Sequence, residues 1–293
     1  MINSEKFVVL LFYKFFKVED PKVLRAEQYD LASKIGLKGR MLIAEEGVNA
    51  TFEGTESQVK EYMDALHSDV RFKDLVFKQS EGTGRAFTKL SIKVRKEVVT
   101  LGQSDFDVQN ETAKELTADD FQEMYEKDED FVVLDLRNDY EIQVGYFDKT
   151  VNPKLDNFRD LPEKLPELED LKNKKVVAVC TGGIRCEKAT CLLNRVGFKD
   201  LYQLKDGIHT YMQKYPGKHF RGTLFVFDNR MTTPVIDDPK REVVGRCFSC
   251  QAVCEDIWSD DSTRPSKKVV CCKSCAAVNP NLRSTSPLSE FST

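Results

Sequence analysis

The stretch that decides the fold is VVAVCTGGIRCEKAT, residues 176–190. Residues 176–179 form a continuous apolar run rich in valine, which is typical of a strand buried on both faces of a sheet. Residues 187–195 have the pattern of a helix. Cys180 therefore lies in a loop between a strand and a helix, where parallel α/β sheets place their functional sites.

The loop that begins at Cys180 has the composition of an anion-binding turn. Its glycines permit positive φ angles, so that successive N–H groups can turn toward the cysteine at the positive end of the following helix. Such a cradle lowers the pKa of a thiol. We therefore expect a reactive, partly exposed Cys180 thiolate, with Arg185 as a fixed cation at the rim. The alternative is that Cys180 merely ends a strand. The loop residues between Cys180 and Arg185 are Thr181, Gly182, Gly183 and Ile184.

The chain divides into five segments by its patterns. Residues 1–101 alternate strands and helices in the order βαββαβ, which predicts a ferredoxin-like (acylphosphatase-like) domain. Residues 102–116 are polar and are expected to be a linker. Residues 117–220 alternate strands and helices, which predicts a parallel sheet with helices on both faces. Residues 221–277 are Cys-rich with little periodicity, and the tail 278–293 is expected to be disordered. The predicted fold class is thus a multidomain combination of α/β and α+β.

The Cys-rich segment contains two Cys-x-x-Cys pairs, Cys247 with Cys250 and Cys272 with Cys275, separated by 21 residues. Each pair can direct two thiolates at one ion, so that together they predict a structural, four-thiolate zinc site. Cys254 and Cys271 lie nearby, and the sequence leaves open whether either joins the site. The alternative is reduced or disulfide-paired cysteines without a metal.

Composition places the chain among globular proteins. It has 293 residues, 41% hydrophobic and 31% charged, and a net charge of −4, which gives no overall attraction to nucleic acid. Its apolar start is interrupted by Lys14 and lacks a signal-cleavage pattern, and no run reaches the ~18–20 apolar residues of a membrane helix. Six of the nine cysteines lie at metal-like spacings within 247–275. We expect a cytoplasmic protein with reduced thiols that does not bind a membrane.

Two groups of polar residues in the first segment have open roles. Arg40, Asn49 and Thr51 lie at a predicted hairpin. They either face a bound substrate or the cleft beside Cys180, or satisfy the backbone of the turn itself. Lys89, Lys93 and Arg95 alternate along a predicted strand. They form either a phosphate-contacting stripe or a solvated edge.

The Cys180 loop resembles the active-site loop of rhodanese-like domains, Cys-x-x-Gly-x-Arg. Upstream, Asp135-x-Arg137-x-x-Tyr140-Glu141 is similar to the Asp-x-Arg…Glu motif of that fold, and the segment 204–208, LKDGI, is similar to its Leu-x-Gly-Gly motif. The resemblance implies that Cys180 carries a persulfide or another covalent intermediate. Four residues separate Cys180 from Arg185, one fewer than in cysteine phosphatases, which disfavours a phosphatase.

The same resemblance assigns supporting residues. Asp135, Arg137 and Glu141 would brace the loop, unless the first two form an ordinary surface ion pair. Cys186 could resolve an oxidised Cys180, or it could be a packed small apolar side chain.

Longer motifs narrow the resemblance to the tRNA uridine(34) hydroxylase family. They are GRMLIAEEGVNAT (39–51), FRDLP (158–162) and FRGTLFVFDNR (220–230). The family implies oxygen-dependent 5-hydroxylation of the wobble uridine, with tRNA rather than DNA as partner and molecular oxygen as co-substrate. No nucleotide-cofactor fingerprint is evident, since Gly82-x-Gly84 is a lone glycine pair. Two other functions stay open: a sulfurtransferase that acts through a Cys180 persulfide, and a non-catalytic adaptor.

Overall fold

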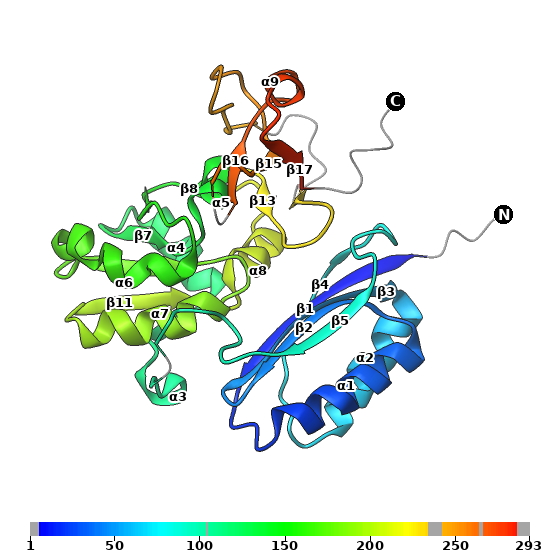
Figure 1. Cartoon of the computed structure of the whole chain (residues 1–293). Helices are drawn as coiled ribbons and strands as arrows, with labels where there is room; N and C mark the ends of the chain where they lie inside the picture. The colour runs from blue at the N-terminus through cyan, green and yellow to red at the C-terminus, as the bar shows by residue number, and fades with distance from the viewer. Residues whose placement is uncertain (1–5, 104, 234–241, 264–265, 286–293) are drawn as a thin grey trace. The chain divides into compact units, whose positions relative to one another are not determined.

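The computed structural model describes residues 6–103, 105–233, 242–263 and 266–285 (Figure 1). These residues fall into two compact units, 1–100 and 101–293. None of the helices in the described ranges is long and apolar enough to cross a membrane.

The first unit has the predicted ferredoxin-like (acylphosphatase-like) arrangement, built on one five-stranded sheet with strand order β4-β1-β3-β2-β5. The first four strands and two helices follow the predicted βαββαβ order, and β5 adds a parallel strand beside β2. Helices α1 and α2 lie together on one face of the sheet (Figure 1). The elements are β1 (Phe7–Phe15), α1 (Pro21–Ile35), β2 (Lys38–Ala44), β3 (Gly47–Thr55), α2 (Glu56–Ser68), β4 (Lys78–Glu81) and β5 (Leu90–Val94).

Local signals fix the helix ends in this unit. Asp20 caps α1, since its carboxylate accepts the N–H groups of Lys22 and Val23. Thr55 and Gln58 form a reciprocal capping box at the start of α2. Together the helices bury the apolar face of the sheet.

The second unit contains the rhodanese-like fold, a parallel five-stranded sheet of order β6-β11-β10-β7-β9. Helices α4 and α8 share one apolar cluster with Val177 and Val179 of β10. Helix α7 contacts β10 and β11 but contributes nothing to that cluster, so it covers the opposite face. The elements are α3 (Val108–Glu111), β6 (Lys114–Leu116), α4 (Ala118–Glu126), β7 (Val132–Asp135), α5 (Asp139–Val144), β8 (Gly145–Phe147), β9 (Thr150–Val151), the 3-10 helix η1 (Phe158–Asp160), α6 (Leu161–Lys164), the 3-10 helix η2 (Leu165–Leu171), β10 (Lys175–Val179), α7 (Ile184–Arg195), β11 (Asp200–Leu204) and α8 (Gly207–Lys214).

Two predictions need correction: that residues 102–116 form a linker, and that the helix after Cys180 begins at residue 187. Residues 102–116, expected to be a linker, include α3 and strand β6, which pairs with β11. A three-residue strand that pairs on one side only needs no apolar run, so its polar sequence gave no signal. In addition, α7 begins at Ile184 rather than at residue 187, which places Arg185 and Cys186 in its first turn.

The C-terminal part of the second unit is more ordered than its sequence suggests. Strand β12 pairs with β8, and a three-stranded sheet has the order β16-β15-β17. The predicted disorder of 278–293 is wrong at 282–284, which form β17, while 286–293 lie outside the described residues. The elements are β12 (Phe220–Gly222), β13 (Leu224–Phe225), β14 (Thr232–Thr233), β15 (Ile257–Asp260), β16 (Lys267–Val270), α9 (Lys273–Val278) and β17 (Leu282–Ser284).

Candidate functional site

Cys180 follows the buried central strand β10 directly, as its sequence predicts, but its side chain is not exposed. Its relative exposure is 0%, as is that of all four residues from Val176 to Val179. The expected partial exposure is therefore wrong. The amides of its own loop and of the start of α7 surround the sulfur, and its burial is not visible in the six residues of the loop.

Three backbone N–H groups surround the Cys180 sulfur. Gly183 N donates to Sγ over 3.2 Å, and the amides of Arg185 and Cys186 also donate to it. Gly183 has a φ of 99° and is the N-cap of α7, so that these amides belong to the helix start. The Cys186 amide also donates to the Gly183 carbonyl over 2.9 Å. The thiol therefore lies at the positive end of α7.

Opposing effects set the pKa of Cys180. Burial would raise it, because a charged sulfur loses its hydration. The hydrogen bond from the Cys186 thiol, the charge of Arg185 and the backbone N–H groups lower it, and the pKa falls to about 5. Cys180 is then a thiolate at neutral pH. Burial and its hydrogen bond to Cys180 raise the pKa of Cys186 well above its ordinary value, so Cys186 keeps its proton and donates it.

The start of α8 holds the carbonyl side of the same loop. Ile208 N donates to the Cys180 carbonyl over 2.9 Å, and His209 N donates to the Thr181 carbonyl over 3.0 Å. The loop carbonyls thus turn toward α8 while its amides turn toward the sulfur. Gly207 permits this approach: a Cβ there would lie 2.7 Å from each of Cys180 O, Thr181 O and Gly183 N.

Arg185 is not a cation at the rim. Its side chain is 7% exposed, and its two terminal nitrogens donate to the two carboxylate oxygens of Glu141 over 2.7 and 2.9 Å. It also donates to Thr181 Oγ1 over 3.2 Å, and its guanidinium lies 5.4 Å from the ring centroid of Phe227. Its charge stabilises the Cys180 thiolate from inside the protein.

Asp135 and Arg137 form a buried ion pair with 0% exposure of both side chains, which excludes the surface alternative. Arg137 donates to both carboxylate oxygens of Asp135 and to the carbonyl of Gly145 over 2.6 Å. Leu136 N, between them, donates to the Val179 carbonyl over 2.9 Å. This pair therefore fixes the end of β10 rather than touching the Cys180 sulfur.

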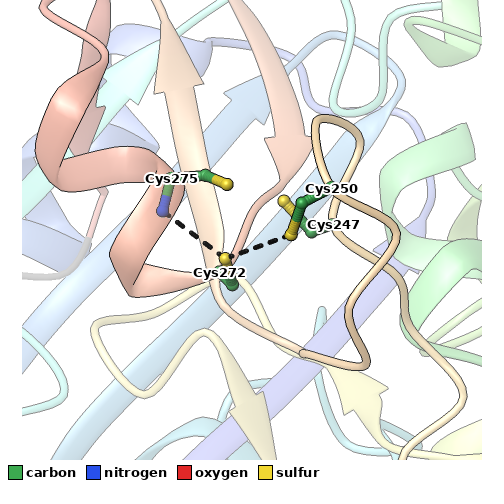
Figure 2. Close-up of side chains that lie close together, drawn as sticks. All are labelled: Cys247, Cys250, Cys272 and Cys275. Carbon is green, nitrogen blue, oxygen red and sulfur yellow. Dashed lines mark hydrogen bonds between the residues drawn. The ribbon is translucent and has the colours of Figure 1, made fainter.

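The four cysteines of the two Cys-x-x-Cys pairs converge, as Figure 2 shows. The sulfur atoms of Cys247, Cys250, Cys272 and Cys275 all lie within 4.8 Å of one another. Cys250 Sγ and Cys272 Sγ are 3.7 Å apart. This separation is close to the roughly 3.8 Å that tetrahedral zinc with Zn–S bonds of about 2.3 Å requires. All nine cysteines lie in the described ranges, and all are free thiols.

Sequence reasoning missed two features of the thiol loop. Phe227 lies over Arg185 although about forty residues separate them, and only its place in the motif 220–230 pointed to it. Glu141 was expected to brace the loop, but its role as the partner of Arg185 was not foreseen. Its burial could not be deduced from a helix-start position.

The fold and the thiol loop define a rhodanese-like protein, and comparison with known families agrees. A model of the UPF0176 acylphosphatase-like domain matches residues 7–98, the rhodanese-like domain matches 117–214, and the rhodanese C-terminal region matches 221–285. A relative from Cytophaga hutchinsonii, named tRNA uridine(34) hydroxylase, is 38% identical over 91% of this chain and 85% of its own. A relative of the same name from Staphylococcus carnosus is 36% identical over 93% of this chain and 90% of its own. A solved rhodanese-like domain protein from Staphylococcus aureus is 25% identical over 33% of this chain and 90% of its own, with a TM-score of 0.28.

The chain belongs to the tRNA uridine(34) hydroxylase family.

Proposed function

We propose that this protein hydroxylates carbon 5 of uridine 34 in tRNA in an oxygen-dependent reaction, with Cys180 as the catalytic nucleophile. The observation that carries the proposal is the cradle of backbone amides around the Cys180 sulfur, which, with Arg185 and the Cys186 thiol, lowers its pKa to about 5. The family supplies the substrate class, since the relatives that match most of the chain are named for it. Arg185 acts as a positioning residue through its charge, while Glu141, Asp135 and Arg137 support the loop.

The thiolate suits a covalent route. The sulfur adds to carbon 6 of the uracil ring, and the electron pair of the 5,6 double bond moves toward carbon 5 as an enolate. Carbon 5 then bonds to molecular oxygen. Two thiols of a reductant supply two electrons and two protons and become a disulfide; the O–O bond breaks, the distal oxygen leaves as water, and the proximal oxygen stays on carbon 5. Loss of the proton from carbon 5 restores the double bond and releases the Cys180 thiolate. Because Cys180 is fully buried, the residues that cover it must move before a base reaches it.

A sulfurtransferase is the second candidate. The same amide cradle would hold the outer sulfur of a Cys180 persulfide, and the match of residues 117–214 to the rhodanese-like domain favours this chemistry. A non-catalytic adaptor is the third, and it requires no reactive Cys180.

We expect tRNA rather than DNA as the nucleic-acid partner, a cytoplasmic location, and no nucleotide cofactor.

We also propose that the four-cysteine cluster holds a structural zinc ion. The sulfur positions support it, because four thiolates at these separations match the ligand set of structural zinc. The surrounding residues support it as well: the local apolar cluster consists of cysteines with little else, namely Cys247, Cys271 and Ala276 with partly buried Cys254, Trp258, Cys272, Cys275 and Leu282. So small a core needs the metal for stability.

Mass spectrometry of tRNA from a deletion strain tests the proposed function. We expect loss of a 5-hydroxyuridine derivative, restored by the wild-type gene but not by Cys180→Ala. Loss of a thiolated base instead would support the sulfurtransferase. Full restoration by Cys180→Ala would refute catalysis by this cysteine, and an unchanged tRNA profile would leave only the adaptor.

A further inference from the structure

The sheet of the first unit has two chemically different faces. Strand register places Phe12, Ala50, Met41 and Ile92 in one cross-strand row, and all four belong to the apolar core. The neighbouring row, Leu10 with Phe52 and Leu90, belongs to the same core. Since side chains alternate along a strand, the rows between them point to the face away from this core.

That second face carries cations. One row consists of Leu11, Thr51, Arg40 and Ser91, with Lys78 also opposite Leu11. The next row consists of Tyr13, Asn49, Leu42 and Lys93. Lys38 lies one row further, opposite Glu53. Lys38, Arg40 and Lys93 are exposed, whereas Lys78 is buried at 5% exposure.

The acidic side chain in these rows, Glu53, already accepts hydrogen bonds from backbone N–H groups. Glu53 is 3% exposed, and its carboxylate accepts the N–H groups of Thr83, Gly84 and Ala86 over 2.8–2.9 Å. Among the described residues of these rows, no other side chain is acidic. This face therefore presents positive charge on a protein whose net charge is −4.

Aromatic rings accompany these cations. Lys78 Nζ lies 4.8 Å from the centroid of the Tyr13 ring, and the Arg40 guanidinium lies 5.8 Å from that of Phe87. Tyr13 and Phe15 meet edge to face, with centroids 6.2 Å apart. Rings and guanidinium groups are the surfaces on which unpaired bases stack, and exposed lysines on the same face, here Lys38 and Lys93, neutralise phosphates.

We propose that this face, defined by Tyr13, Lys38, Arg40 and Lys93, binds an unpaired RNA segment. On the proposed function, that segment is the anticodon loop of the substrate tRNA. RNA is the occupant that fits, because the exposed cations Lys38, Arg40 and Lys93 match phosphates, and the aromatic rings match bases. The face positions substrate and takes no part in the chemistry at Cys180.

The test compares two pairs of exposed lysines in the full-length protein. Lys38→Ala with Lys93→Ala removes two charges from this face. Lys34→Ala with Lys60→Ala removes two from helices α1 and α2 on the other side. Binding of an unmodified tRNA transcript is measured over a series of salt concentrations in the Cys180→Ala background. The first pair should reduce the slope of log affinity against log salt by roughly 1.4, at about 0.7 for each single-strand phosphate contact. The second pair should leave the slope unchanged.

Tyr13 tests the stacking part separately. Tyr13→Leu should weaken binding about five- to 150-fold, because stacking of one base on an aromatic ring contributes about 1–3 kcal/mol, whereas Tyr13→Phe should bind like the parent. Equal slopes for both lysine pairs would overturn the proposal, even if Tyr13→Leu fails to fold. If the wild type hydroxylates tRNA but the Lys38 and Lys93 substitutions leave tRNA binding unchanged, only this inference fails. If it binds RNA through the face but hydroxylates nothing, the proposed function fails instead.

Discussion

The buried Cys180 thiolate is stable because its neighbours donate hydrogen bonds to the sulfur or supply positive charge near it. Gly183 and the first amides of α7 donate to the Cys180 sulfur, and Cys186 keeps its proton because its own pKa is raised. Arg185 supplies positive charge while Glu141 balances it. The sulfur is therefore ionised without contact with solvent, which is the condition for a nucleophile that reacts only after its cover opens.

Removing the thiol donor should raise the pKa of Cys180. In Cys186→Ala we expect a rise of roughly one to two pH units, since a hydrogen bond to a charged group contributes about 1.5–3 kcal/mol. Cys186→Ser keeps a donor and should stay near the wild-type value. The pKa of Cys180 is measured by ultraviolet thiolate absorbance, taken as the difference from the corresponding Cys180→Ser protein. An unchanged value in Cys186→Ala would remove Cys186 from this role.

Neutralising the partner of Arg185 should destabilise the second unit. Glu141→Gln leaves a buried guanidinium without its counter-charge, for which we expect a loss of about 3–5 kcal/mol. Trp258 is the single tryptophan and lies in this unit, so its fluorescence during urea unfolding reports the change. Glu123→Gln in the exposed pair with Lys127 is the control and should cost less than about 1 kcal/mol. Equal losses would mean that the buried pair has no special role.

At the level of elements, two helix starts form the site. The N-terminal amides of α7 face the sulfur, and those of α8 bind the carbonyls of Cys180 and Thr181. The loop between β10 and α7 is thus held from both sides, and its orientation depends on how closely α8 approaches it. Gly207 controls that distance.

Gly207→Ala should displace the loop. A Cβ at this position meets three backbone atoms at 2.7 Å, in addition to the strain of its φ of +73°. We expect a loss of at least about 1–3 kcal/mol and a rise in the pKa of Cys180. Gly197→Ala is the matched control, because its φ is +96° but nothing lies within 4 Å of the added Cβ. If both variants behave alike, backbone strain alone explains the loss and the approach of α8 has no consequence for the thiol.

The elements around the loop were largely predictable, and their side-chain partners were not. The valine run of 176–179 and the glycines after Cys180 predict the strand, the turn and the amide cradle from local physics. The ion pair of Arg185 joins residues 44 positions apart, and the contact of α8 with the loop carbonyls depends on tertiary packing. Local pattern carries no information on either, so exposure of Cys180 and Arg185 was expected where burial is found. Strand β6 was missed because three polar residues at a sheet edge have no periodicity.

At the scale of the whole molecule, the chain combines a thiol site, a basic sheet face and a cysteine cluster on two compact units. The cysteine cluster is in the same unit as the thiol site. Its sheet β16-β15-β17 packs Ile257 and Val270 against Tyr140, Val144 and Phe225, whereas the side of the sheet at the cysteines has only a small apolar cluster. The stability of the cysteine side should therefore depend on the proposed metal.

Loss of the metal should unfold this sheet first. Trp258 Nε1 donates to the Cys271 carbonyl over 2.8 Å, so its fluorescence should change when a strong chelator is added to the reduced protein. Cys272→Ser should lower the zinc content from about one per chain toward zero, whereas Cys191→Ser, outside the cluster, should leave it at one. Zinc near zero in gently purified, reduced wild type would contradict the proposed site.

The measurement that tests the central claim most directly is the titration of Cys180 in the wild-type protein, followed as the absorbance difference from Cys180→Ser. We expect a midpoint at about pH 5. Because this folded-state pKa lies below the unfolded value of about 8.5, ionisation of Cys180 stabilises the fold most above that pH. That stabilisation should decline as the pH falls toward 5. A midpoint at an ordinary thiol value of about 8.5 would contradict the account of the site.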